Sequence, residues 1–184
     1  MNTLEREINK ALNILRKGGV ILYPSDTIWG IGCDATNTNA IKKIYNIKRR
    51  KESKALITLV SNKTQLKKLT GHIPNLDIIS NPTTIIYPNV KFLSSNILAK
   101  DGSAAIRIAN DTFCNKLINQ LDFPIVSTSA NISGNSYPKK FSEITDEIKD
   151  NVDYIVNLRQ KEIMDSPSSI IKISNLGNIE IIRK

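Results

Sequence analysis

The chain has 184 residues, 40% of them hydrophobic and 23% charged, which is typical of a globular domain large enough to bury its own core. No apolar run approaches the roughly 18 residues of a membrane span, and the amphipathic, acid-containing N-terminus excludes a secretory signal or a transit peptide. Two widely separated cysteines and one histidine exclude a Cys/His zinc cluster and argue against a disulfide framework. We therefore expect one domain over residues 1–184, no membrane association and a cytoplasmic location.

The net charge of +9 is only a weak indication of a nucleic-acid partner. The chain holds 19 Lys and 7 Arg beside 30 Ile and 20 Asn, the profile expected when codon bias favours Ile, Asn and Lys. Part of the lysine surplus then reflects composition and not a binding partner. The placement of individual arginines is the stronger indication.

Helical and strand patterns alternate in the first half of the chain. Apolar residues recur at helical spacing over 4–15, with Asn2 and Glu5 placed as N-cap and capping-box partner. A second helix has Thr38 or Asn39 as its N-cap and ends near Lys48. The other elements expected here are a strand over 20–23, a strand over 55–60 and a short helix over 64–69.

Strands predominate in the second half of the chain, after a loop over 71–81. Asp111 or Thr112 caps the one long helix expected there, and a second helix covers 142–149. The expected strands cover 83–87, 103–109, 124–129, 154–158, 169–173 and 179–183. This arrangement predicts an α/β fold with a mixed sheet flanked by helices.

Residues 42–54 contain seven Lys or Arg and one Glu, and the charge is densest from Lys48 to Lys54. Like charges repel, so such a run is either a solvated loop or a cradle for an anion such as polyphosphate or nucleic acid. In a cradle, Arg supplies a planar fork and Lys a mobile point charge. Charge alone favours the solvated loop.

The segment from Ser127 to Gly134 follows a predicted strand and reads STSANISG. Its small side chains expose backbone N–H groups, and its hydroxyls add donors, as in an anion-binding turn. The alternative is an ordinary helix cap or Ser/Thr turn. The chain has no Walker motif, and its Gly30 and Gly32 do not continue into a dinucleotide-binding fingerprint.

The residues of a nucleophilic triad are not in place. His72 lies in a Gly/Pro-flanked loop, which indicates a surface residue and not a general base. Cys33 and Cys114 have no histidine near them in sequence and are expected to be small buried hydrophobes. Trp29 is able to stack on a base, but a single Trp in an apolar strand is usually a core residue.

Arg107 alternates with isoleucines in a predicted strand. Such an arginine either projects to solvent or points into a cleft, where it clamps a carboxylate or a phosphate. Asp26, Asp34 and Asp101 are possible magnesium ligands, but their spacing in the sequence does not favour any one of them. Residue chemistry alone therefore predicts an α/β domain with anion-binding loops, but it does not identify a reaction.

Five ordered segments, YPSDTIWGIGCDA, KRRKESKALITLV, AAIRIA, STSANISG and SPSSIIKI, resemble the YrdC/TsaC family of threonylcarbamoyl-AMP synthases in its short form. The resemblance runs from about Gly19 to the end of the sequence. It implies a single-domain, YrdC-like fold: a twisted mixed parallel/antiparallel sheet flanked by helices, with a basic concave cleft.

The implied reaction forms L-threonylcarbamoyl-adenylate and pyrophosphate from L-threonine, bicarbonate and ATP, with Mg²⁺. Other proteins, the downstream transferase machinery, would then transfer the threonylcarbamoyl group to the tRNA adenosine beside the anticodon. The chain itself is a further candidate for direct tRNA binding. By resemblance, the catalytic residues are Lys48, Arg50, Ser129 and Asn131, and Lys54 supports them. The ATP contacts implied are Lys48, Arg50, Ser103, Asn131 and Arg183, and the threonine contacts are Ser25, Arg107, Ser129 and Ser168.

These residue types suit the implied reaction. Attack at the α-phosphate passes through a highly anionic state that fixed Lys and Arg charges stabilise. Arg107 is suited to the threonine carboxylate, and Lys48 and Arg50 are expected to face solvent and the ATP phosphates. The sequence departs from the family where residues 79–84 replace W-P-G-P-x-T and where Ser25 replaces the usual Thr of the Y-P-T motif.

Two other functions fit parts of the sequence. A module that binds tRNA or double-stranded RNA without catalysis would use the basic residues for phosphate contacts. The related carbamoyl-adenylate chemistry of hydrogenase maturation uses a similar domain inside a much larger chain, and this sequence lacks the additional domains.

Overall fold

The structure is a computed structural model that describes residues 2–51, 56–73, 82–174 and 176–184. The helices are α1 (Thr3–Arg16), α2 (Thr38–Ile47), α3 (Lys63–Thr70), α4 (Thr112–Leu121) and α5 (Asp146–Lys149), with 3-10 turns η1 (Ser95–Ile97) and η2 (Phe141–Glu143). The strands are β1 (Ile21–Pro24), β2 (Trp29–Asp34), β3 (Ile57–Val60), β4 (Thr83–Tyr87), β5 (Ala104–Ile108), β6 (Ile125–Ser129), β7 (Tyr154–Ile155), β8 (Ser169–Ile173) and β9 (Ile179–Arg183).

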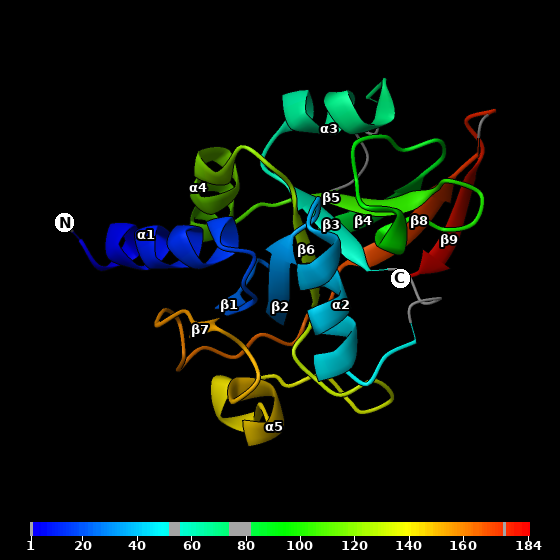
Figure 1. Cartoon of the computed structure of the whole chain (residues 1–184). Helices are drawn as coiled ribbons and strands as arrows, with labels where there is room; N and C mark the ends of the chain where they lie inside the picture. The colour runs from blue at the N-terminus through cyan, green and yellow to red at the C-terminus, as the bar shows by residue number, and fades with distance from the viewer. Residues whose placement is uncertain (1, 52–55, 74–81, 175) are drawn as a thin grey trace.

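The strands form one nine-stranded sheet in the order β7-β1-β2-β6-β3-β5-β4-β8-β9 (Figure 1). The pairs β1/β7, β3/β5 and β4/β8 are parallel, and the other five are antiparallel. The predicted mixed sheet flanked by helices is therefore confirmed. No helix among the described residues is both long and apolar enough to cross a bilayer.

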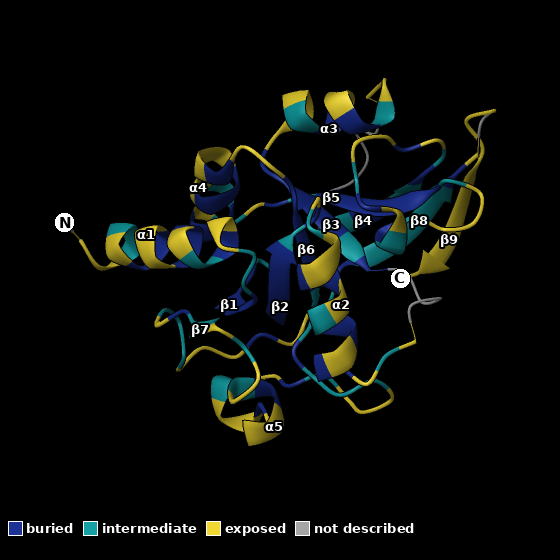
Figure 2. Cartoon of the chain, viewed as in Figure 1, coloured by how far each residue is buried: buried dark blue, intermediate teal, exposed yellow. Residues whose placement is uncertain are grey.

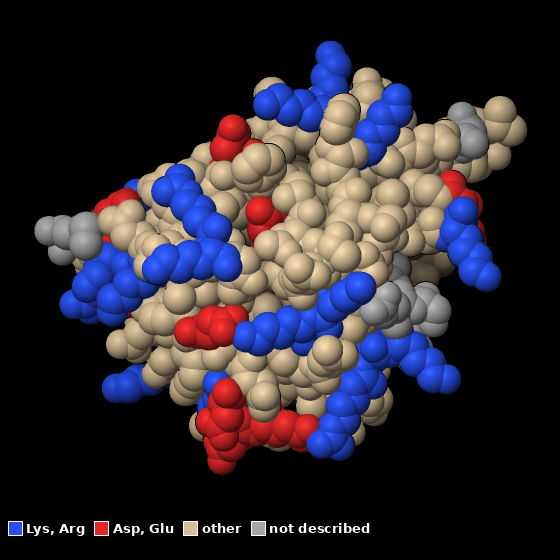
Figure 3. All heavy atoms as spheres, in the orientation of Figure 1, with Lys and Arg blue, Asp and Glu red and all other residues tan. Residues whose placement is uncertain are grey.

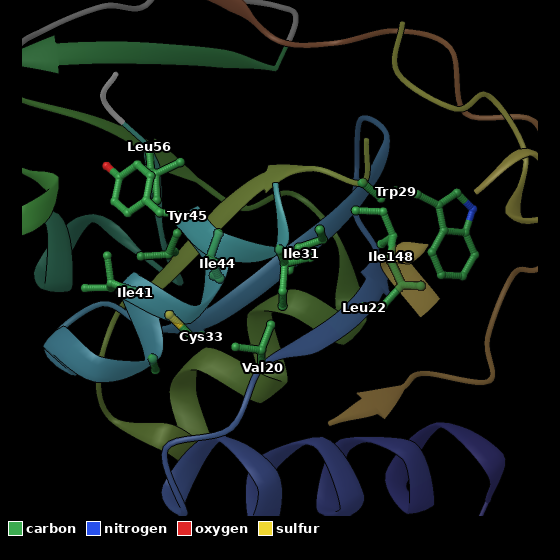
Figure 4. Packing of buried hydrophobic residues seen from close by; sticks show 14 of the residues in the cluster. Val20, Leu22, Trp29, Ile31, Cys33, Ile41, Ile44, Tyr45, Leu56 and Ile148 are labelled. Atoms are coloured by element: carbon green, nitrogen blue, oxygen red, sulfur yellow. The ribbon is translucent and has the colours of Figure 1, made fainter. Parts of the chain in front are cut away.

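The helices pack on the two faces of the sheet because side chains alternate along each strand. Leu59 and Ile125 pack with residues of α1 and α4, whereas their neighbours Val60 and Val126 pack on the opposite face, where α2 and α3 lie. Figure 4 shows this second face, where Ile41 and other residues of α2 pack against β1 and β2. The burial colours of Figure 2 show that the central strands are buried and that β9 is exposed.

Polar side chains define the helix starts. Asn2 caps α1, because its side chain accepts from the backbone N–H of Glu5. The side chain of Glu5 accepts from Lys116 Nζ of α4. Asn37 caps α2, one residue before the predicted start, since its amide oxygen lies 3.0 Å from two backbone nitrogens of the first turn. Of the two candidates for α4, Asp111 is the cap.

Most predicted elements are present, and three need correction. The strand predicted over 154–158 is the two-residue strand β7, which ends at Ile155. The apolar strand around Trp29 is β2, for which sequence analysis set no bounds. The helix predicted over 142–149 is divided into the 3-10 turn η2 and the short helix α5, because Ile144 is extended (ψ 126°) between them. The predicted loop over 71–81 lies mostly outside the described residues.

Candidate active site

A pocket opens on the sheet face that carries α1 and α4, beyond the area that these helices cover. Strand register brings its floor together: Gly30 pairs with Ser129, Ser127 pairs with Ile57, and Arg107 lies two residues beyond the partner of Ile57 on β5. Paired residues point to the same face of a sheet, so these side chains converge on one side. The pocket therefore draws on strands β2, β6, β3 and β5.

The pocket has a volume of about 230 Å³. Small-molecule pockets commonly measure roughly 300–1,000 Å³, so this one suits a ligand of amino-acid size better than a whole nucleotide. Six of the residues implied by resemblance line it: Ser25, Arg50, Arg107, Ser129, Ser168 and Arg183. Three of these are arginines, so the wall is basic, as the family resemblance implies.

The basic run from 42 to 54 does not act as one unit. Lys42 is exposed, Lys43 Nζ lies 2.6 Å from Asp153, and Arg49 pairs with Glu147 of α5. Among the described residues of the run, only Arg50 lines the pocket, where burial lowers its pKa. Figure 3 likewise shows basic side chains spread over the visible face with acidic ones beside several of them. Lys54 lies outside the described residues.

Lys48 is buried, with 1% of its surface exposed. Its Nζ donates to the backbone carbonyls of Ser129 and, at 2.6 Å, Asn131, on the STSANISG segment. In the other direction, Ser133 N donates to the carbonyl of Lys48. The expectation that Lys48 faces solvent is wrong, because the last turn of α2 directs its side chain beneath the loop after β6.

This environment changes the basicity of the amine. Loss of hydration, followed by repulsion from Arg50, lowers the pKa of Lys48 to about 7. Near neutral pH the amine therefore exists in both protonation states. It holds the loop after β6 by hydrogen bonds whichever state it adopts.

Arg107 is buried and already has protein partners. Its terminal nitrogens donate to Asp26 Oδ1 at 2.8 Å and to Thr27 Oγ1 at 3.1 Å. Asp26 Oδ2 also accepts from the backbone N–H of Asn110. The Nε of Arg107 is buried and has no hydrogen-bond partner among the described residues. A buried donor without a partner is costly, so this atom is a candidate contact for a ligand.

The hydroxyls of Ser25 and Ser168 take part in internal hydrogen bonds. Ser25 Oγ lies 2.8 Å from the carbonyl of Ile28 and accepts from the backbone N–H of Thr27, which closes the β1–β2 turn. Ser168 Oγ lies 2.8 Å from the hydroxyl of Thr84. The carbonyl of Ser168 accepts from Arg183 at 2.6 and 3.1 Å, so Arg183 orients this loop.

Ser129 and Asn131 lie on the loop that Lys48 holds, and both are half-buried. The Asn131 amide donates to the carbonyls of Ile132 and Asn135, whereas its Oδ1 is buried without a partner among the described residues. Ser129 lines the pocket, whereas Asn131, an implied catalytic residue, is not among the lining residues.

Ser103, an implied ATP contact, is separate from this pocket and borders a second hollow of about 400 Å³. Register places both hollows on one face: Ser127, Ile57, Ala105 and Ile86 form a continuous row across β6, β3, β5 and β4. The first two residues line the pocket, and the last two line the second hollow. Ser103 itself donates to an aspartate, Asp101.

The remaining candidates lie outside the pocket or already have protein partners. His72 is exposed, and Trp29 is fully buried against Phe141, as predicted. Cys33 and Cys114 are buried free thiols, which also confirms the prediction. The candidate magnesium ligands have other partners: Asp26 pairs with Arg107, Asp34 with Thr36, and Asp101 with Ser103.

Carboxylates for a metal are not assembled in the described part of the chain. No group of three or more His, Cys, Asp or Glu side chains there is placed to hold an ion. A site in which three protein side chains hold Mg²⁺ is therefore not formed by these residues. Mg²⁺ is usually bound by one or two carboxylates together with substrate phosphates.

Several pocket residues were missed by sequence analysis. Thr27 and Tyr137 line the pocket, and the hydroxyl of Tyr137 lies 3.1 Å from the carbonyl of Asp165. Arg159 contacts the backbone of the β1–β2 turn. The Tyr137 contact joins residues that are 28 positions apart, and the Arg159 contact joins residues that are 134 positions apart. Such contacts cannot be predicted from local sequence.

Comparison with known proteins identifies the family. The family model Sua5/YciO/YrdC, described as "Telomere recombination", matches residues 13–184. The threonylcarbamoyl-AMP synthase of Psychromonas ingrahamii is 32% identical, over 90% of this chain and 87% of that protein. The crystal structure of P. abyssi Sua5 complexed with L-threonine is 25% identical with a TM-score of 0.79, over 91% of this chain and 51% of Sua5.

E. coli YciO shares the fold with a TM-score of 0.82 and 23% identity, over 98% of this chain and 89% of YciO. The family model covers far more than half of the sequence, and both solved structures share the fold over more than nine-tenths of this chain. The chain belongs to the Sua5/YciO/YrdC family.

Proposed function

We propose that this protein is a threonylcarbamoyl-AMP synthase, a nucleotidyltransferase that uses L-threonine, bicarbonate and ATP. The observation that carries the proposal is the convergence of Arg50, Arg107 and Arg183 with serine hydroxyls on one pocket of amino-acid size. Support comes from relatives named for this activity and from the related Sua5 structure with L-threonine.

The proposed reaction needs no protein nucleophile. The threonine amine takes up carbon dioxide derived from bicarbonate, and an oxygen of the resulting carbamate attacks the α-phosphorus of ATP. A new P–O bond forms to the carbamate while the bond to pyrophosphate breaks. The residues of the chain bind, orient and neutralise charge, which is how most phosphoryl-transfer sites act.

Arg107 is the proposed contact for the threonine carboxylate, and its unpartnered Nε supplies the available donor. Ser25, Ser129 and Ser168 shape the rest of the threonine site. A site that pairs with the substrate hydroxyl rejects analogues lacking it far more strongly than a hydrophobic pocket rejects an analogue that lacks a methyl group. We therefore expect serine to be a poorer substrate than threonine, and 2-aminobutyrate poorer still.

The nucleotide is proposed to extend from Arg50 and Arg183 at the pocket towards the second hollow at Ser103, along the same sheet face. Lys48 and Asn131 contribute to its phosphate end by shaping the loop after β6, and Lys54 is a further proposed contact. Mg²⁺ is proposed to arrive with the ATP phosphates, since the three candidate ligands, Asp26, Asp34 and Asp101, already have protein partners. A cytoplasmic location and transfer of the product to tRNA by other proteins complete the proposal.

The test is pyrophosphate release by purified protein given ATP, Mg²⁺, bicarbonate and L-threonine without tRNA. Release that requires both threonine and bicarbonate supports the synthase. Salt-sensitive RNA binding without such release would instead support a binding module. Arg107→Lys sharpens the test, because it keeps a cation beside Asp26 but loses the planar fork, and the threonine KM should rise at least about tenfold.

A further inference from the structure

The β1–β2 turn forms one wall of the pocket and is held from two directions. Inside the pocket, Arg107 donates to Asp26 and Thr27 of the turn. Outside it, Arg159 NH1 donates to the carbonyl of Ser25 at 3.0 Å. The first contact belongs to the proposed substrate site, whereas the second comes from a segment after β7 that has no place in the proposed chemistry.

Arg159 joins three parts of the structure. The same NH1 that reaches Ser25 also donates to Asp111 Oδ2 at 2.9 Å, and its Nε donates to Glu162 Oε2 at 2.7 Å. Asp111 is at once the N-cap of α4, since its other oxygen accepts from the N–H of Cys114. The guanidinium therefore fixes the turn to the start of a helix that packs in the core.

The backbone of Arg159 shows that this arrangement is costly. Its φ is 53°, in the left-handed region that side chains other than Gly and Asn rarely adopt. Glycine would take this conformation without strain. The position nevertheless holds an arginine whose side chain makes all three contacts, and its side chain is 31% exposed, so burial of apolar surface does not account for it.

We propose that Arg159 is a positioning residue for the pocket. It holds the Ser25 carbonyl against Asp111 and so keeps the β1–β2 turn in the shape that presents Ser25 and Thr27 to the ligand and Asp26 to Arg107. The part of this inference that concerns threonine rests on the proposed function. The part that concerns the turn itself does not.

The decisive variant is Arg159→Gly in the full-length protein. It removes the three hydrogen bonds but suits the positive φ, so the thermal midpoint should stay close to that of the wild type. Loss of a net-favourable hydrogen bond to the turn should raise the threonine KM by about five- to tenfold, with kcat changed less than about twofold. Arg159→Lys keeps one cationic donor and should restore part of the loss.

Two control variants separate this effect from general ones. Asp122→Gly also introduces glycine at a positive-φ residue (φ 64°), at the C-terminal end of α4. It should leave the threonine KM unchanged. Glu162→Gln removes the charge of the exposed partner of Arg159 without touching the turn, and it too should leave KM near the wild-type value.

Hydrogen–deuterium exchange of the peptide over residues 24–30 gives a readout that does not need activity. The N–H groups of Thr27 and Ile28 are held by Ser25 Oγ, so exchange there should become faster in Arg159→Gly and not in the controls. Unchanged exchange in Arg159→Gly overturns the inference, whatever the kinetics. An unchanged threonine KM in an active enzyme also overturns it. If the wild type shows no threonine-dependent pyrophosphate release, the proposed function fails, and exchange alone decides whether Arg159 positions the turn.

Discussion

Replacement of Lys48 by methionine tests whether a buried amine without a carboxylate partner weakens the fold at neutral pH. Lys48 is nearly inaccessible, and its Nζ contacts two backbone carbonyls. Burial lowers its pKa to about 7, whereas an unfolded lysine titrates near pH 10.4. Between these values the unfolded chain binds more protons than the folded one, so the stability of the wild type must rise with pH.

The size of the effect follows from linkage. From pH 7 to pH 9.5, a lysine with these two pKa values adds about 3 kcal/mol to the free energy of unfolding. The Lys48→Met variant lacks this pH-dependent contribution to the free energy of unfolding. It also leaves two backbone carbonyls without a donor, but the resulting loss of stability is the same at both pH values. The difference in unfolding free energy, wild type minus Lys48→Met, should therefore increase by about 3 kcal/mol across this window.

Urea unfolding followed by the fluorescence of Trp29, the single and fully buried tryptophan, measures this difference at pH 7 and pH 9.5. Lys42→Met, an exposed lysine of the same helix, is the matched control and should show no pH-dependent difference from the wild type. A Lys48→Met difference that changes by less than about 0.5 kcal/mol, within extrapolation error, or that falls with pH, would refute the reasoning.

Three further predictions follow from single contacts. Arg50→Ala should lower threonine-dependent pyrophosphate release at least about 100-fold, while Arg49→Ala, whose guanidinium pairs with a glutamate of α5, should stay within about twofold; equal losses would contradict the assignment. Gly32→Ala would place Cβ 2.5 Å from a backbone oxygen of β6, so thermal unfolding should occur at a markedly lower temperature or the chain should fail to fold. Burial raises the pKa of the Cys33 and Cys114 thiols, and both should resist a thiol reagent until the protein is denatured.

The bounds of β8 and β9 could be predicted from sequence because their signals are local. Each is a short apolar, β-branched run, and between them the backbone N–H of Ser174 donates to the carbonyl of Asn178. β2 was harder to bound. Its glycines at 30 and 32 weaken the strand pattern, yet Gly32 is required, because Tyr23 and β6 leave no room for a side chain at that position.

Side-chain direction limited the prediction of the site. A lysine that ends a helix and begins a basic run is usually solvated, yet Lys48 is buried because the loop after β6 returns over the end of α2. The contacts of Arg107 and Arg159 with the β1–β2 turn could not be predicted either, since they join positions about 80 and 134 residues apart. Resemblance selected the residues, and only tertiary structure shows which of them meet in one pocket.

The placement of Lys48 also bears on protein engineering. A protein tolerates a destabilising group when activity depends on it, and random substitution commonly finds more stable sequences at such positions. A library screened only for resistance to heat at neutral pH should therefore enrich for uncharged residues at position 48. Because Lys48 is proposed to shape the phosphate end of the site, we expect variants recovered in this way to be stable but poorly active. A thermostable member of this family should therefore be selected with turnover measured in every round.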